Sequence, residues 1–202
     1  MTLPLKHIIG EMNKISAMPA IFQLELMNCI ERIEISKNEV LLERGQLCDY
    51  YYYIEKGILS CHEWDDAGSK EYCTWLMFEG NIATSILSFN NRVLSMDAIR
   101  PIEDSVLHLL RWEHVDRFTR ESRAFALIRQ ELTNRYYLHM SNISAQRLRP
   151  PELFYQYLEN LYGDNFYRIP GKIMASHIGI SESSFYEIKK KFGRKNRKGA
   201  KR

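Results

Sequence analysis

The sequence predicts an α+β protein with an N-terminal β-roll, a long central helix and a C-terminal helix-turn-helix unit. Three observations predict this order. Residues 34–111 are short runs of β-forming residues, separated by Gly, Asn and Asp turn signals. Residues 112–146 return to an apolar period of three to four, which is typical of a helix. Residues 171–192 hold two short apolar helical patterns on either side of Gly179.

The chain begins with a helical pattern over residues 5–33, which Pro19 divides into two helices. We expect the second of these helices to bury one apolar stripe. The stripe consists of Ile21, Leu24, Met27 and Ile30.

Strands are expected at residues 39–45, 50–54, 57–64, 70–78 and 96–110, which together form a roll of about 80 residues able to enclose a small ligand.

If residues 65–69 form a five-residue hairpin loop, Trp64 pairs with Lys70 and Cys61 lies opposite Cys73. A redox-sensitive disulfide then becomes geometrically possible. A loop shorter by one residue places Cys61 opposite Tyr72 instead, and a reducing compartment keeps thiols apart.

A short helix is expected near residues 113–118 and a long one over residues 121–146. The long helix carries a narrow apolar stripe, more than a small neighbouring element covers. We expect a homodimer contact through this helix, with packing on the chain's own roll as the alternative. The stripe consists of Phe125, Ile128, Leu132, Tyr136 and Met140.

Arg149-Pro150-Pro151 ends the long helix and marks a boundary. The predicted domains are therefore a sensor of residues 1–111, a connecting and dimerisation helix of 112–148, and a helix-turn-helix domain of 149–202. In that last domain Ala175 lets the two helices approach, Gly179 takes the positive φ of the turn, and Ser181 caps the second helix.

The end of the chain is strongly basic. Residues 189–202 hold nine of the 28 Lys and Arg residues and none of the 25 acidic residues. A cationic segment that continues from a candidate recognition helix suits phosphate neutralisation on double-stranded DNA; a solubilising tail is the alternative. The predicted DNA contacts are Ser181, Ser183, Ser184, Tyr186 and Lys190, with Lys189, Arg194, Lys195 and Arg197 on phosphates.

Other classes of protein are disfavoured. No apolar run is long enough to span a membrane and no secretory leader is evident, so we expect a cytoplasmic protein without a membrane partner. The four cysteines lack metal-site spacing, and the six histidines include no His-x-His pair. No nucleotide-binding or nucleophile motif is present, so we expect no enzyme, no catalytic residue, no metal and no cofactor.

Nearly the whole chain resembles the family of bacterial transcription regulators that includes the cyclic-AMP receptor protein and FNR, the Crp/Fnr family. Residues 42–49 and 53–59 are similar to that family's first strands and glycine corners, 78–82 to the run into its ligand cassette, 98–107 to the next strands, and 173–188 to its DNA-reading unit. The resemblance implies a β-roll of the cyclic-nucleotide-binding type and a homodimer on DNA, with RNA polymerase as a further partner.

The chain departs from this family at the sites that matter most. Its Gly-Glu pair for ribose aligns with Thr84-Ser85, and its Arg-Ser/Thr-Ala run for the cyclic phosphate aligns near Arg92 or Ser95. The possible ligand pocket is therefore Thr84, Ser85, Arg92 and Ser95, and cyclic AMP is not the expected effector.

The recognition helix also departs from the family, with Glu187 where an arginine that reads guanine is usual. No strand pair follows Phe192, so the wing is expected to be truncated or absent. We therefore expect a DNA-binding regulator that senses an unknown small effector or none. The alternative is a sensor whose helical C-terminal region binds a protein partner and not DNA.

Overall fold

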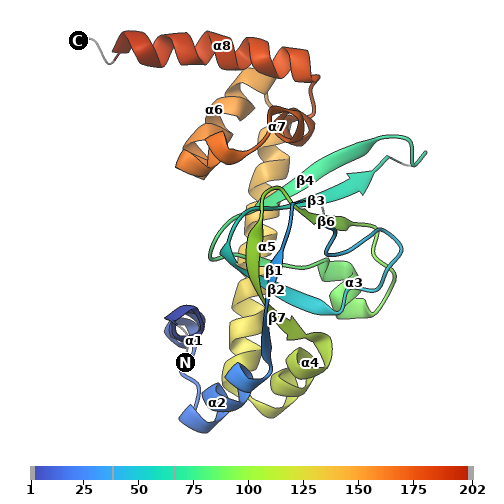
Figure 1. The fold of residues 1–202 in the computed structure, drawn as a ribbon, viewed down its shortest axis with the longest axis vertical. Coiled ribbons are helices and arrows are strands. Elements are labelled where there is room, and N and C mark those ends of the chain that lie inside the picture. Colours follow the sequence, from blue (N-terminus) through green and yellow to red (C-terminus); the bar gives the residue numbers. More distant parts are fainter. Residues whose placement is uncertain (1–2, 38, 66, 200–202) are drawn as a thin grey trace. The chain divides into compact units, whose positions relative to one another are not determined.

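The computed structural model describes residues 3–37, 39–65 and 67–199 (Figure 1); the side chains of residues 3, 4 and 193–199 lie outside the description. The chain divides into two compact units, one of residues 1–61 and 76–139 and one of residues 62–75 and 140–202. Helices and antiparallel strands both occur, which confirms the predicted α+β class.

The elements follow one another along the chain without a repeat. The helices are α1 (Leu3–Ile15), α2 (Ala20–Asn28), α3 (Ile86–Asn91), α4 (Trp112–Glu121), α5 (Arg123–Arg147), α6 (Pro151–Tyr162), the 3₁₀ helix η1 (Gly163–Arg168), α7 (Gly171–Ile178) and α8 (Glu182–Gly199). The strands are β1 (Ile30–Ile35), β2 (Tyr50–Lys56), β3 (Leu59–Trp64), β4 (Glu71–Met77), β5 (Ile82–Ala83), β6 (Ala98–Pro101) and β7 (Ser105–Arg111).

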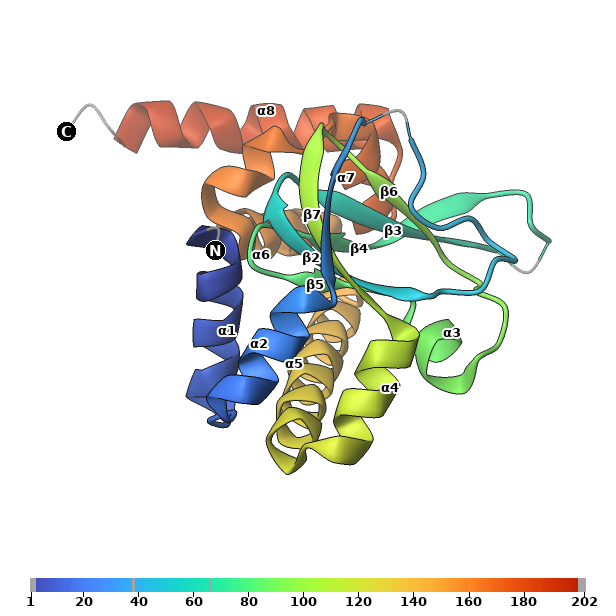
Figure 2. The same ribbon diagram turned by 60° about the horizontal axis from the view of Figure 1, so that its bottom comes forward.

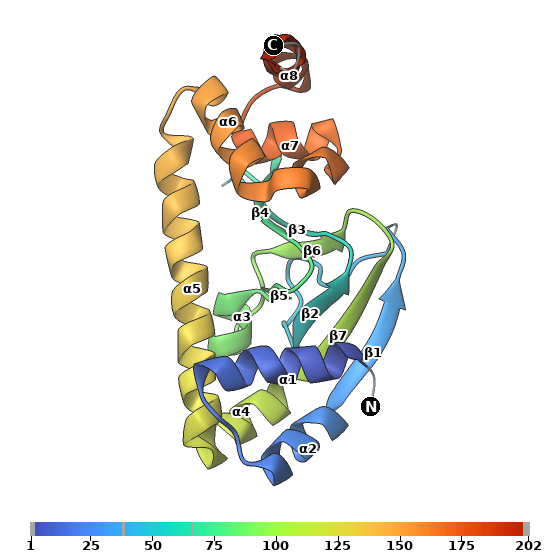
Figure 3. The same cartoon turned by 90° about the vertical axis from the view of Figure 1, so that its left-hand side faces the viewer.

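Two sheets form the roll, with strand orders β1-β7-β2-β5 and β4-β3-β6. In the first sheet β7 pairs antiparallel with both β1 and β2, and Tyr52 stands opposite Leu109. Side chains alternate between the faces of a strand. Tyr52 and Ile54 are therefore buried inside the roll, whereas Tyr51 and Tyr53 face the layer of α1, α2 and α5 (Figures 2 and 3).

The corner after β2 depends on Gly57. This residue has φ of 106°, and a Cβ there would lie 2.1 Å from Oγ of Ser105. Its N–H donates to Oε1 of Glu79 at 2.9 Å. A side chain at this position would be excluded both by the backbone conformation and by the close approach of Ser105, so the predicted glycine corner is confirmed.

The predicted apolar stripe near the N-terminus is wrong. Ile21 and Leu24 are 75% and 55% exposed, while Leu26 is fully buried. The helix also ends at Asn28, and Ile30 opens strand β1. The buried face of α2 is set by Leu26 and by Phe22, which packs edge-on against Phe118.

Three further differences concern the roll. Residues 39–45 form no strand and contribute only an isolated bridge from Leu42 to Ile99. Strand β1 was not expected, because its sequence IERIEI continues a helical pattern. Helix α3 was not expected either, because it is only six residues long and its sequence lacks a helical period.

The hairpin between β3 and β4 is shorter than expected. The N–H of Asp65 donates to the carbonyl of Lys70 at 2.9 Å, so Asp65, and not Trp64, stands opposite Lys70. The expected pairing of Trp64 with Lys70, from which the opposition of Cys61 and Cys73 followed, is therefore wrong. All four cysteines are free thiols.

The first residues of the predicted α5 stripe pack within the first compact unit. Phe125 and Ile128 are buried, and the Phe125 ring lies 5.6 Å from that of Phe118. The alternative of packing on the chain's own roll thus holds for the start of the helix. The exposed apolar residues of α5 lie on a different face and include Leu127 and Leu138.

Among the described residues, no helix has both the length and the apolar content to cross a membrane.

Candidate nucleic-acid interface and ligand cassette

The turn between α7 and α8 is a Schellman motif. Gly179 has φ of 88°, and its N–H donates to the carbonyl of Ser176 at 3.2 Å. The N–H of Ile180 donates to the carbonyl of Ala175 at 3.0 Å. These two bonds satisfy carbonyls at the end of α7 and turn the chain sharply into the next helix. The predicted helix-turn-helix geometry is confirmed.

Ser181 caps the second helix of the motif. Its Oγ accepts a hydrogen bond from the backbone N–H of Ser184 at 3.1 Å, as an N-cap residue does. The same Oγ lies 2.9 Å from Oγ of Ser183 and 2.8 Å from Oγ of Ser184. Three hydroxyls therefore form one cluster at the start of α8.

The motif is held by an aromatic core. Tyr155 of α6 lies 5.8 Å from the ring of Phe185 and stacks on Phe192 at 5.7 Å. The buried apolar side chains of the predicted seam are Met174, Ile178, Phe185 and Ile188, and its half-buried ones are Ile173, Ile180 and Phe192. Burial of this seam leaves the opposite face of α8 in solvent.

The exposed face carries most of the predicted base-contact residues. Ser181 and Ser183 are exposed, Ser184 is half-buried, and Tyr186 is 50% exposed. The Tyr186 ring lies over Gly171, where a Cβ would come within 2.5 Å of its hydroxyl oxygen. This contact fixes the aromatic ring at the edge of the face.

Charges of both signs follow along the same helix. Lys189 and Lys190 are exposed, and so are Glu182 and Glu187. Lys191 lies 3.8 Å from Glu152 of α6. The side chains of Arg194, Lys195 and Arg197 fall outside the described residues, but the helix itself continues to Gly199. Within the described ranges no strand follows α7, as expected for a missing wing.

The sequence did not reveal how residues 62–75 contact the helices of the second compact unit, to which they belong. His177 is 1% exposed; its Nδ1 lies 3.1 Å from the carbonyl oxygen of Cys73 and its Nε2 lies 3.0 Å from the hydroxyl of Tyr162. The N–H of Cys73 donates to Oγ of Ser176 at 2.9 Å. Arg147 donates to the same Cys73 carbonyl at 3.2 Å.

Burial shapes the chemistry of this network. It raises the pKa of the Cys73 thiol to about 12 and lowers the pKa of Arg147. The network fixes α7 through its two adjacent polar residues, Ser176 and His177. In the sequence, these two polar residues within the apolar pattern of α7 were a signal of this contact.

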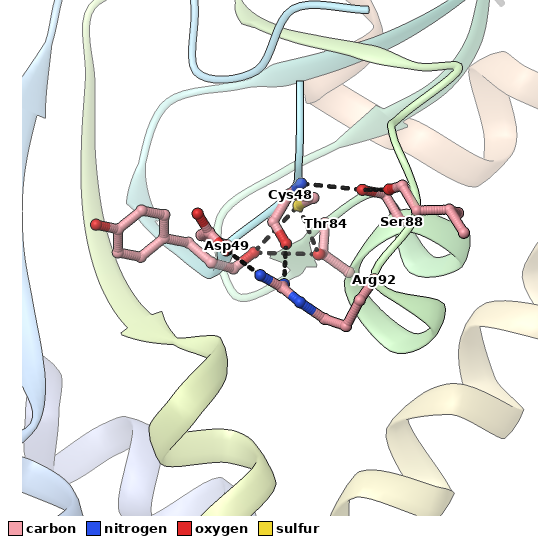
Figure 4. A network of polar contacts seen from close by, with 7 residues as sticks. Cys48, Asp49, Thr84, Ser88 and Arg92 are labelled. Atoms are coloured by element: carbon pink, nitrogen blue, oxygen red, sulfur yellow. Dashed lines mark hydrogen bonds and ion pairs between the residues drawn. The ribbon is translucent and has the colours of Figure 1, made fainter. Parts of the chain in front are cut away.

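The cassette that aligns with the phosphate-binding run is closed by its own side chains (Figure 4). Arg92 Nη1 donates to the carbonyl of Cys48 at 3.0 Å, and its Nη2 lies 2.5 Å from Oδ1 of Asp49. The guanidinium also lies 4.5 Å from the ring centre of Trp112. The only cation expected in the pocket is thus neutralised and stacked.

The other predicted pocket residues are also engaged. Thr84 donates to the carbonyl of Tyr50 at 3.1 Å. Ser95 donates to Oγ of Ser85 at 2.9 Å, and Ser85 in turn donates to Asp97 at 2.5 Å. The structure therefore places Arg92 and Thr84 in one set of contacts and Ser85 and Ser95 in another. A phosphate needs several donors around one point, which this arrangement does not offer.

In the described part of the chain, no group of three or more His, Cys, Asp or Glu side chains is placed to hold a metal ion.

Among the comparisons with known proteins, only the one with solved structures found matches. Scans of the chain against family models and against curated protein sequences found no match. Solved structures do match. FixK2 from Bradyrhizobium japonicum has a TM-score of 0.70 at 11% identity, over 83% of this chain and 86% of that one.

Two further structures extend this likeness. A protein from Eubacterium rectale, assigned to the Crp/Fnr family of transcriptional regulators, has a TM-score of 0.70 at 13% identity, over 88% and 85% of the two chains. The c-di-GMP responsive global regulator CLP from Xanthomonas campestris has a TM-score of 0.67 at 14% identity, over 88% and 93%. The chain therefore has the fold of the Crp/Fnr transcription regulators.

Proposed function

We propose that this protein is a DNA-binding transcription regulator of the Crp/Fnr type. The observation that carries the proposal is the α7–Gly179–α8 motif, whose second helix buries one face and exposes another. In such motifs the start of the second helix lies in the major groove. The hydroxyl cluster of Ser181, Ser183 and Ser184, with Tyr186 beside it, occupies that start.

Phosphate contacts follow from the charges that continue along α8. Lys189 and Lys190 are exposed. We also assign phosphate contacts to Arg194, Lys195 and Arg197, which lie in the next turns of α8. Each phosphate that a cation neutralises releases counterions, so affinity should fall steeply with salt.

Base preference should differ from that of a regulator with arginine on its recognition helix. Glu182 and Glu187 are exposed on α8, and a carboxylate accepts from the amino group of cytosine but cannot donate to guanine. Serine hydroxyls contact several bases with little discrimination. We therefore infer a site that favours cytosine on one strand of each half.

Dimerisation through residues 121–146 remains part of the proposal. The exposed face of α5 carries Leu127 and Leu138, which are 46% and 61% exposed. Eleven positions separate them, about three helical turns, so both project from the same side. Covering this side with a second copy gives a two-fold dimer whose two motifs reach successive major grooves about 34 Å apart.

The domain division into residues 1–111, 112–148 and 149–202 belongs to the same proposal, as do a cytoplasmic location and RNA polymerase as a partner. The self-contained contacts of Arg92 support a roll that senses something other than a cyclic nucleotide, or has no effector.

A second function is favoured by the acidic residues on the exposed face. Glu182, Glu187 and the half-exposed Tyr186 also suit a surface for a protein partner. Binding to a protein would not depend on the basic residues of α8 in the way that DNA binding does.

Duplex binding across a salt series tests the proposal. A variant with Lys189, Arg194, Lys195 and Arg197 changed to Ala should lose affinity for all sequences and flatten the slope of log K against log salt by about 3 to 4, near 0.9 for each phosphate lost. The matched control changes four exposed lysines outside α8, namely Lys6, Lys37, Lys56 and Lys70. An equal loss in both variants, or an unchanged slope in the first, contradicts the assignment.

A further inference from the structure

A small cavity lies on the outer face of the first sheet, away from the cassette. Its volume is about 40 Å³, and its lining residues come from α1, α2, α5 and the strands of that sheet. Its walls are mostly apolar and include Ile8, Leu26, Leu110, Phe125 and Ile128. A water needs about 10 to 15 Å³ in this measure, so the space holds about three groups of that size.

His108 lines this cavity and has a buried ring nitrogen without a hydrogen-bond partner. His108 is 3% exposed, and its Nε2 lies 2.6 Å from Oε2 of Glu55. Its Nδ1 is buried and has no hydrogen-bond partner. A carboxylate only accepts, so Nε2 donates to Glu55, and a ring that carries this one proton offers Nδ1 as an acceptor. A buried acceptor without a partner is costly, and a ligand that donates to it removes that cost.

The remaining polar side chains of the wall are Tyr51, Tyr53 and Arg129. Arg129 lines the cavity, but its guanidinium donates to Asn90 Oδ1 at 2.6 Å and to Thr119 Oγ1 at 3.3 Å. Glu55 places a negative charge next to His108 and disfavours an anion there. The arrangement therefore selects against acids and favours a neutral molecule with one donor.

We propose that this cavity is a binding site for a small neutral alcohol, with a short apolar body against the isoleucine and leucine walls and a hydroxyl that donates to Nδ1 of His108. The site lies where α5 packs on the roll, because Phe125 and Ile128 line it. An occupant there contacts both the sheet and the helix that we propose joins the two copies. Its role as an effector rests on the proposed function, whereas its binding does not.

Methyl NMR of the full chain, without DNA, tests the binding. Four isoleucines line the cavity, Ile8, Ile30, Ile82 and Ile128, and Ile173 and Ile178 of the other unit serve as internal controls. Titration with ethanol, which has three non-hydrogen atoms, should give saturable shifts on the four lining methyls and none on the controls. The ¹⁵N resonance of Nδ1 should move as an acceptor nitrogen does on gaining a hydrogen bond.

Dimethyl ether is the matched probe, because it is an isomer of ethanol without a donor. It should bind about fivefold more weakly, the factor expected for one neutral hydrogen bond. Equal affinity for the two isomers, or shifts that rise linearly and spread to the controls, overturns the proposal.

Two variants keep the test decisive. His108→Phe should abolish the preference for ethanol over the ether. If that variant does not fold, Ile8→Phe fills the cavity from α1 and leaves the His108–Glu55 pair in place; it should abolish binding of both isomers. Ile21→Phe adds the same atoms at a 75% exposed position of α2 and should bind like the parent. Ethanol binding that survives Ile8→Phe contradicts the assignment. Absence of DNA binding would leave this result standing and would contradict only the proposed function.

Discussion

The guanidinium of Arg92 and the carboxylate of Asp49 form an ion pair at 2.5 Å inside the cassette. In a pocket for a cyclic phosphate such a guanidinium would face the ligand. Here it is held by protein atoms, namely this carboxylate, the carbonyl of Cys48 and the ring of Trp112. These contacts join the residue after α3 to Cys48 and Asp49 and to the start of α4.

The first prediction concerns this residue. Arg92→Ala should lower the free energy of unfolding by about 1 to 2 kcal/mol, because a partly exposed ion pair and a cation–π contact each contribute modestly. Arg92 also has φ of 56°, which favours glycine. Arg92→Gly should therefore cost about 0.5 to 1 kcal/mol less than Arg92→Ala in urea denaturation. An Ala variant as stable as the Gly variant would show that the backbone carries no strain there.

The turn of the helix-turn-helix motif gives a second prediction. Gly179→Ala should destabilise the protein by about 1 to 2 kcal/mol, because the residue has φ of 88° although no atom lies within 4 Å of the place that a Cβ would take. The control is Gly10→Ala within helix α1, where space is equally open and φ is ordinary. That change should stabilise by up to about 1 kcal/mol. Denaturation in which both variants move in the same direction would contradict the turn geometry.

The cap of α8 separates stability from DNA binding. Ser181→Ala should cost about 1 kcal/mol through loss of the bond to the N–H of Ser184. Ser181→Asp retains a capping oxygen and should keep the stability, yet its negative charge should weaken duplex binding. Paired unfolding and anisotropy measurements check this. An Asp variant that binds duplex DNA as well as the parent would place Ser181 outside the interface.

The thiols give a fourth prediction. Burial raises the pKa of Cys73 to about 12, so at pH 8 that thiol is almost wholly protonated and unreactive. Cys48 and Cys61 are buried as well, whereas Cys29 is half-buried. Alkylation of the folded protein at pH 8, read by peptide mass spectrometry, should label Cys29 first. Labelling of Cys73 at a similar rate would show that its strand opens readily.

Much of the fold was predictable because its signals are local. Gly57 and Gly179 mark turns that need positive φ, Ser181 marks a helix start, and Pro150-Pro151 marks a helix end. Each of these depends on residues close in sequence, so a pattern along the chain reveals them.

The wrong predictions concern positions whose burial or secondary structure depends on residues distant in the sequence. Ile21 satisfies a helical stripe but is exposed, because the position of Phe118 and the sheet selects Leu26 and Phe22 as the buried face. The sequence of strand β1 is compatible with a helix as well as a strand. Its antiparallel pairing with β7 makes it a strand. The contacts of Arg92 were likewise invisible, because Asp49 lies 43 positions away.

The selection of random-sequence duplex DNA by the full chain, repeated with and without cyclic AMP, tests the central claim most directly. We predict enrichment of a two-fold symmetric site with half-sites about 10 base pairs apart, a preference for cytosine within each half, and no effect of cyclic AMP. Failure to enrich any site at low salt would contradict this claim and would direct attention to a protein partner for the face of Glu182, Tyr186 and Glu187.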